Sequence, residues 1–247
     1  MTDHLLRKLG SGVSPAGQIW LIDRISRPKQ FKQRQELVLE GDVCDEAYFV
    51  LEGIVSRSKH LVGGTRAILA FLLPGDFCAL DLMISARMDH DLTCETSCSV
   101  VSIPRVLLRK MLVANPGLAA NLANDILLGG AIQRQWLANM HNSSLKRIAH
   151  LLCELMTRMS GIGLVDEGSF LLPLSQHELG EALGISSVHV NRTLQQLRDL
   201  RMVRIRHRMV VITNLAQLKA FAEFDEDYLN GALTFAERVS YADDASD

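Results

Sequence analysis

Aromatic residues make up only 5% of this 247-residue chain, and it has no long apolar run. Because 48% of the residues are hydrophobic, we expect Leu, Ile, Val, Met and Ala to fill the core. The longest stretches without Asp, Glu, Lys or Arg, residues 9–22 and 111–124, contain 14 residues each. A membrane-spanning helix needs about 20. Asp3, Arg7 and Lys8 flank the first leucines, so the sequence predicts neither a membrane span nor a secretory signal.

The chain is also poor in cysteine, with five residues and no C-x-x-C pair. This number is too small for a disulfide framework and fits a reducing compartment, so we expect a cytoplasmic protein. A cysteine in an apolar segment is more often a small core residue than a reactive thiol, although two of the five would share one face of a strand, Cys94 and Cys98. The others are Cys44, Cys78 and Cys153.

Positive charge is concentrated in one segment of a chain whose net charge is −2. Residues 185–215 carry six arginines against Asp199, whereas residues 216–247 carry eight acids against Lys219 and Arg238. A local basic cluster in a nearly neutral protein is the pattern expected for binding phosphates, although an arbitrary cluster of this kind is more often a solvated surface. The arginines are Arg192, Arg198, Arg201, Arg204, Arg206 and Arg208.

Short apolar runs separated by turn residues fill the chain from residue 31 to residue 103. Glu36–Glu40 is followed by Gly-Asp, and Ala67–Leu73 is followed by Pro-Gly-Asp. Runs of this length and spacing predict several antiparallel strands, and therefore a small barrel or jelly roll.

Beyond Pro104 the apolar residues recur every three or four positions, which predicts one long amphipathic helix over residues 118–143 and a second over 145–159. A barrel of this size cannot cover the first helix, so we expect its stripe to form the seam of a homodimer. The alternative is a stripe packed only on its own barrel. The expected seam residues are Leu122, Ile126, Gly129, Ile132, Trp136 and Met140.

The next segment has the signals of two short helices joined by a turn. Ser175 and Glu178 have the spacing of a capping box, which starts the first helix. Gly184 supplies the turn, and Ser186 can cap a second helix that runs to about Leu200. The pattern predicts a helix-turn-helix.

A basic hairpin follows, with strands over 202–206 and 209–213 and a turn at His207-Arg208. A helix-turn-helix followed by such a hairpin is a winged helix. One more helix is expected over residues 214–230, before an acidic tail.

These segments resemble the CRP/FNR family of bacterial transcription regulators over nearly the whole chain. Glu40-Gly41-Asp42, Tyr48–Gly53 and Leu73–Phe77 match the family's glycine corners, and Gly184–Arg192 matches its recognition-helix motif. The resemblance implies an α+β fold, with an N-terminal jelly-roll β-barrel of the cyclic-nucleotide-binding type, a long dimerisation helix and a C-terminal winged helix-turn-helix.

Four parts are therefore expected. They are a sensor domain over residues 15–112, the dimerisation helix over 113–144, the DNA-binding domain over 145–215, and a C-terminal helix with an acidic tail over 216–247.

The resemblance also suggests roles in DNA binding. Arg192 matches the family arginine that reads guanine, and a bidentate contact of this kind contributes about 1–3 kcal/mol of discrimination. Asn191, Val188 and Ser187 take the other base-facing positions. Val188 stands where relatives usually carry glutamate, so the target sequence should differ from theirs. The residues expected at phosphates are Ser175, Ser186, His189, Arg204, Arg206 and Arg208.

The family's cyclic-nucleotide site is degenerate in this chain. Its Gly-Glu-Leu turn is replaced by Ala79, Leu80 and Asp81, and its Arg-Ser/Thr pair by His90 and Asp91. The Asp91 carboxylate would repel a cyclic phosphate, so cyclic AMP is not expected to be the effector. No cysteine precedes Cys44, which also excludes the N-terminal iron–sulfur site of oxygen-sensing relatives. We expect no cofactor and no metal.

Other functions remain open as alternatives. One is a haem- or thiol-based redox-sensing regulator, although His60 and His90 have no second ligand at useful spacing. Another is a cyclic-nucleotide-binding signalling protein. An enzyme is not expected, because the chain has no H-x-H pair of the cupin type and no catalytic triad or phosphate loop. The expected partners are double-stranded DNA, a second copy of the chain and, if the protein is an activator, RNA polymerase, but no membrane.

Overall fold

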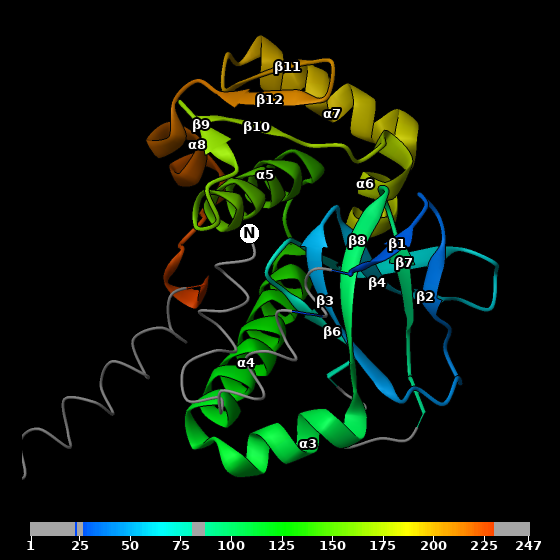
Figure 1. Ribbon diagram of the computed structural model, residues 1–247. Helices are drawn as coiled ribbons and strands as arrows, with labels where there is room; N and C mark the ends of the chain where they lie inside the picture. The colour runs from blue at the N-terminus through cyan, green and yellow to red at the C-terminus, as the bar shows by residue number, and fades with distance from the viewer. Residues whose placement is uncertain (1–22, 24–26, 81–86, 230–247) are drawn as a thin grey trace, which may run out of the picture. The chain divides into compact units, whose positions relative to one another are not determined.

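A computed structural model describes residue 23, residues 27–80 and residues 87–229 (Figure 1). Within these residues the chain forms two compact units. One contains the residues up to Lys59 and those from Ala70 to Gly130, and the other contains His60–Leu69 and Ala131–Leu229. No helix of the described ranges is both long and apolar enough to cross a membrane.

The strands from Lys29 to Pro104 form two four-stranded sheets, as expected for a jelly roll. The first has the order β1-β8-β3-β6 and the second the order β2-β7-β4-β5. The pairings β1–β8, β3–β8, β3–β6, β2–β7 and β4–β7 are all antiparallel. The bounds are β1 (Lys29–Phe31), β2 (Glu36–Val38), β3 (Glu46–Glu52), β4 (Val55–His60), β5 (Arg66–Leu72), β6 (Phe77–Cys78), β7 (Asp91–Cys94) and β8 (Cys98–Pro104).

Strand β3 is buried on both faces, which explains why its sequence is an apolar run without alternation. One covering layer comes from α3 (Arg105–Ala114) and the start of α4 (Pro116–Asn139), whose Leu108 and Leu118 join the core that contains Phe49. Helix α3, at the foot of β8 in Figure 1, was not predicted from the sequence.

The corner after β3 requires glycine. Gly53 has a φ of +88°, and a Cβ there would lie 2.5 Å from the carbonyl oxygen of Ser97 and 2.7 Å from Sγ of Cys98. Any side chain would therefore push the β3–β4 corner away from the β7–β8 turn.

Helix α4 begins and ends at local signals. Pro116 occupies the first turn, where no backbone donor is lost, and the side chain of Asn115 accepts the N–H of Leu118 at 3.2 Å. The helix ends at Asn139, four residues before the predicted end, and the next helix is capped by Ser143, which accepts from the N–H of Lys146.

The second unit carries a four-stranded antiparallel sheet in the order β11-β12-β10-β9, together with the helices α5 to α8. The helix-turn-helix and its hairpin lie where the sequence predicted them, whereas β9 and β10 were not predicted. The helix that begins at Leu215 ends at Ala222 rather than residue 230, because Glu223 takes a left-handed conformation, and residues 227–229 are helical again. The bounds are α5 (Ser144–Ser160), β9 (Val165–Asp166), β10 (Ser169–Leu171), α6 (Gln176–Leu183), α7 (Ser187–Asp199), β11 (Val203–Arg206), β12 (Met209–Ile212) and α8 (Leu215–Ala222).

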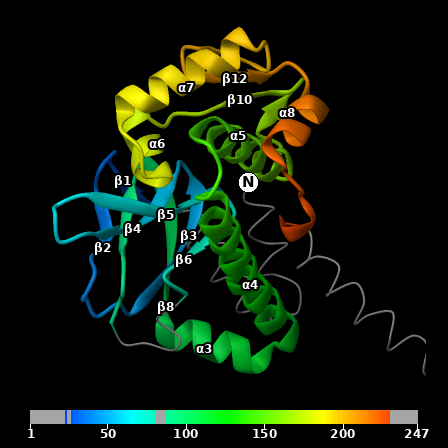
Figure 2. The same ribbon diagram turned by 180° about the vertical axis from the view of Figure 1, so that it is seen from behind.

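A buried carboxylate connects three segments of this unit. Glu154 of α5 is fully buried and accepts hydrogen bonds from Nε1 of Trp136 and from the hydroxyl of Tyr228, both at 2.9 Å. Arg158 lies 3.2 Å from its other oxygen. The end of α4 and the segment after α8 are thereby fixed to α5, which Figure 2 shows in the middle of the unit.

Candidate DNA-binding interface

The first helix of the pair, α6, is started by the predicted capping box. The N–H of Glu178 donates to Oγ of Ser175 at 3.2 Å, and the N–H of Ser175 donates to Oε2 of Glu178 at 2.6 Å. Glu178 is only 4% exposed, so its carboxylate serves the fold. The Ser175 hydroxyl is a helix cap, and its predicted phosphate contact would have to use its remaining proton.

The turn between α6 and α7 depends on two glycines. Gly184 supplies the turn, as predicted, and its backbone is left-handed, at φ 62° and ψ 38°. Gly180 was not singled out from the sequence, although a Cβ there would lie 2.5 Å from the carbonyl oxygen of Ile185. That residue also donates its N–H to the carbonyl of Gly180 at 3.0 Å. The close approach of the two helices therefore requires glycine at position 180.

Helix α7 separates buried from exposed residues along its length. Val190, Leu194 and Leu197 are buried in the unit, whereas Val188 is 78% exposed. The predicted base readers share this outer side: Asn191 and Arg192 are exposed and Ser187 is partly exposed. Arg192 forms no ion pair with any described residue. Its guanidinium is available to an external acceptor such as a guanine edge.

Two predicted phosphate contacts already have partners in the turn. Ser186 accepts the N–H of His189 at 3.2 Å and thereby caps α7. Nε2 of His189 lies 2.7 Å from the hydroxyl of Ser144 in α5. Both residues fix the start of α7, and their contact with phosphate stays a prediction.

The hairpin β11–β12 presents a row of exposed cations. Arg204, Arg206 and Arg208 are all exposed, and none forms an ion pair within the described part of the chain. Arg206 pairs with Met209 across a two-residue turn in which His207 has a φ of +49° and Arg208 a φ of +65°. Two consecutive left-handed residues make the type I′ geometry that suits a hairpin. In this geometry the backbone of residues other than Gly, Asn and Asp is strained. The tip of the hairpin is basic despite this cost.

Four of the five residues at the degenerate effector positions are described, and these four are buried in the barrel. Asp91 is 5% exposed, and its Oδ1 accepts the backbone N–H of Glu40 at 2.7 Å. His90 is also buried, and its Nδ1 lies 2.6 Å from the exposed Asp89, whose pKa this hydrogen bond lowers. Ala79 and Leu80 are buried as well. Asp81 lies outside the described residues.

Comparisons with known proteins agree with this architecture. Residues 28–115 match a cyclic nucleotide-binding domain, and residues 146–221 match a Crp-like helix-turn-helix domain. A global nitrogen regulator of Synechococcus elongatus is 26% identical over 219 residues, which are 85% of this chain and 91% of that protein. The structure of FixK2 from Bradyrhizobium japonicum aligns with a TM-score of 0.70 at 25% identity, covering 78% of this chain and 96% of that one. The chain belongs to the CRP/FNR family of transcription regulators.

A further relative of this CRP/FNR regulator is the transcriptional activator protein FnrL of Cereibacter sphaeroides. It is 23% identical over 211 residues, which are 83% of this chain and 84% of that protein. The relatives are transcription regulators, so the expectation that the chain is not an enzyme is confirmed. Among the described residues of the CRP/FNR regulator, no group of three or more His, Cys, Asp or Glu side chains is placed to hold a metal ion.

All five cysteines of the CRP/FNR regulator are buried and none forms a disulfide. Cys94 ends β7 and Cys98 begins β8, and Sγ of Cys98 donates to the carbonyl oxygen of Ile54 at 3.4 Å. The interaction with the neighbouring thiol lowers the pKa of Cys98 to about 7 and raises the pKa of Cys94. Burial raises the pKa of Cys153 to about 12, as expected for a core residue.

The predicted seam of the CRP/FNR regulator is only partly exposed. Leu122 and Ile132 are each 5% exposed and pack within their own chain, whereas Ile126 is 51% and Met140, just beyond the helix, is 57% exposed. The region around Gly129 is open, with nothing within 4 Å of a Cβ there. Trp136 instead contacts Glu154, and two exposed residues escaped the sequence analysis, namely Leu127 and Leu137.

Proposed function

We propose that this CRP/FNR regulator acts in the cytoplasm as a homodimer that binds an inverted-repeat promoter site through α7. The observation that carries the proposal is the outer side of α7, where Arg192 is exposed without a partner among the described residues beside Asn191 and Val188. Arg192 would bind O6 and N7 of guanine, and Val188 a thymine methyl group. The three hairpin arginines would hold phosphates.

The dimer is supported by the apolar side chains that α4 leaves exposed. Ile126, Leu127 and Leu137 are between 51% and 67% exposed, which is unusual for large apolar residues on one helix. A second copy of α4 would cover them. A two-fold dimer then presents its two α7 helices to successive major grooves, so the half-site centres should be about 10–11 bp apart.

Selection of bound sites from random DNA at one stated salt concentration tests the recognition. We expect an inverted repeat with the spacing given above and one strongly preferred guanine in each half. A selected site without two-fold symmetry would refute the proposed dimeric recognition. Sedimentation of Leu127→Lys and Leu137→Lys tests the seam separately, because two buried lysines should give monomers. The same change at the exposed Val113 of α3 serves as the control.

We propose further that cyclic nucleotides do not control this protein. Asp91 would place a buried carboxylate, already held by the Glu40 N–H, where relatives bind the cyclic phosphate. Calorimetric titration with cyclic AMP and cyclic GMP should show no binding below the millimolar range. A micromolar dissociation constant for either nucleotide would contradict this part of the proposal.

A thiol-responsive regulator is the second candidate, favoured by the interaction with Cys94 that lowers the pKa of Cys98 to about 7. Hydrogen peroxide would oxidise the two thiols to one disulfide and would itself be reduced to two molecules of water. An alkyl hydroperoxide would form the same disulfide and be reduced to one alcohol and one water. Peptide mapping after peroxide treatment, with and without reductant, tests this candidate. Absence of a Cys94–Cys98 linked peptide while DNA binding persists would exclude it.

A further inference from the structure

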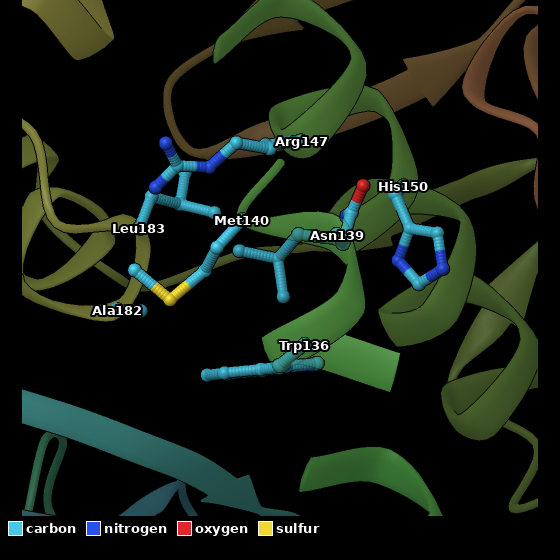
Figure 3. A pocket seen from close by; sticks show the side chains of 8 residues that line it. Trp136, Asn139, Met140, Arg147, His150, Ala182 and Leu183 are labelled. Atoms are coloured by element: carbon cyan, nitrogen blue, oxygen red, sulfur yellow. The ribbon is translucent and has the colours of Figure 1, made fainter. Parts of the chain in front are cut away.

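A small pocket lies within the second unit, between the end of α4, the first turns of α5 and the end of α6 (Figure 3). Its empty volume is about 280 Å³, part of which is open to solvent. Trp136, Met140 and Leu183 supply apolar walls, and Arg147 and His150 supply polar groups. None of these residues belongs to the outer side of α7 or to the barrel.

The His150 side chain has an unused polar atom in this pocket. The residue is 2% exposed, and its Nδ1 has no hydrogen-bond partner among the described residues. Its other ring nitrogen has only a long contact, 3.5 Å, with the side-chain nitrogen of Gln135. Figure 3 shows the ring with one nitrogen facing Asn139 across the pocket.

The Arg147 side chain brings an unpaired positive charge to the same pocket. Its Nη2 is buried without a hydrogen-bond partner among the described residues, and the guanidinium makes no ion pair with them. Nη2 and the methyl group of Met140 both approach the α6–α7 turn, at 3.8 and 3.9 Å from the position of a Cβ on Gly184. In Figure 3 this guanidinium lies beside Leu183, at the end of the pocket away from His150.

These two groups need an acceptor that the described residues do not supply. Leaving a buried polar atom unsatisfied costs about 1–3 kcal/mol, and more for a charged group. Desolvation lowers the pKa of His150 to about 4, so at neutral pH the imidazole is uncharged, with one nitrogen that donates and one that accepts. A guanidinium has donors only and matches a carboxylate through two parallel hydrogen bonds.

We propose that this pocket binds a small organic acid. Its carboxylate would pair with Arg147, its short apolar chain would lie against Met140 and Trp136, and a polar group at its far end would bond Nδ1 of His150. The site does not depend on the proposed DNA recognition. Because Ala182 and Leu183 of α6 form one wall, an occupied pocket would hold α6 in a fixed position against α5.

Nuclear magnetic resonance of the full chain tests the site directly. The probes are 4-hydroxybutyrate, butyrate and the uncharged butyramide, and the signal is the imidazole resonance of His150, assigned with His150→Gln. We expect saturable shifts in the millimolar range with both carboxylates, larger with 4-hydroxybutyrate, and none with butyramide. No saturable shift with either carboxylate, or equal shifts with butyramide, would overturn the proposal.

Arg147→Gln should weaken carboxylate binding at least tenfold. The matched control is Lys146→Gln, which removes the neighbouring charge of α5, a charge that pairs with Glu223 instead of facing the pocket. If Arg147→Gln fails to fold, Arg147→Lys retains the charge without the planar fork and should still weaken binding severalfold. Unchanged affinity in a folded Arg147 variant would refute the role of this residue and with it the site.

Discussion

The barrel and the helix-turn-helix carry equally clear family motifs, but their polar side chains are used differently. On α7 the candidate base readers are exposed, and Arg192 forms no ion pair within the described ranges. In the barrel the described residues at the effector positions are buried, and Asp91 accepts the N–H of Glu40. An exposed cation costs the fold little and remains available for an external partner, whereas a buried carboxylate must be satisfied within the fold. In this protein a family motif therefore indicates a binding function only where its polar atoms have no hydrogen-bond partner within the fold.

The largest expected effect is a loss of stability at acidic pH, caused by His150, a buried polar residue of the second unit. Burial lowers the pKa of His150 to about 4, below its ordinary value of 6.5, so the unfolded chain binds the proton more readily between these values. The contribution of this imidazole to the free energy of unfolding is fully present above pH 6.5. It is lost as the pH falls toward 4, and the loss is about 3 kcal/mol in total. Ionisable groups near the imidazole are Arg147 and Glu154 of its own helix α5 and Tyr228 of the segment after α8.

Denaturant unfolding at several pH values measures this loss. In His150→Gln the dependence between pH 6.5 and 4 should be much shallower, while His141→Gln, an exposed residue of the same segment, should leave it unchanged. An identical pH dependence in the wild type and in His150→Gln would assign the acid sensitivity to other groups.

A substitution of Asp91 tests whether the buried polar residues of the barrel serve its stability. Asp91→Ala removes the acceptor of the Glu40 N–H inside the barrel, and deletion of a charged hydrogen-bond partner costs about 1.5–3 kcal/mol. We expect a lower midpoint of denaturant unfolding with unchanged affinity for DNA at low temperature. A variant of unchanged stability would show that the barrel does not depend on this carboxylate.

A substitution of Arg192 tests whether the exposed residues of α7 serve DNA binding, and here we expect a change in affinity without a change in stability. Arg192→Ala should leave the unfolding midpoint unchanged and reduce affinity for the selected site by about 1–3 kcal/mol, with relaxed preference at one base pair. Binding titrations on the site and on its point variants measure both quantities. Equal weakening on every sequence would make Arg192 a phosphate contact instead of a base reader.

The smallest effect is expected at the hairpin tip. Arg208→Gly relieves a left-handed φ of +65° and should raise stability by about 0.4–1 kcal/mol, although it removes a cation. Binding to all DNA sequences should weaken, and the slope of log affinity against log salt should fall by about one. Arg206→Ala, outside the strained turn, should change the slope in the same way without the gain in stability.

Much of the second unit could be predicted from the sequence, because its signals are local. The capping box of Ser175 and Glu178, the left-handed Gly184 and the two-residue turn at His207-Arg208 each involve residues within a few positions of one another. Hydrogen bonds of this range form wherever the sequence permits them, so the order of the elements follows directly. The composition of the apolar runs predicted the jelly roll in the same way.

Tertiary structure alone decided which of these residues remain available. The burial of Leu122 and Ile132, the contact of Trp136 and Tyr228 with Glu154, and the bond between Asp91 and Glu40 all join residues distant in the chain. Periodicity marks a residue as apolar or polar but does not reveal which distant group covers it. The unsatisfied atoms of Arg147 and His150 can be recognised only once three helices have been packed around them. Whether a polar atom has a hydrogen-bond partner depends on every residue that the fold brings near it, and most of these residues are distant in the sequence.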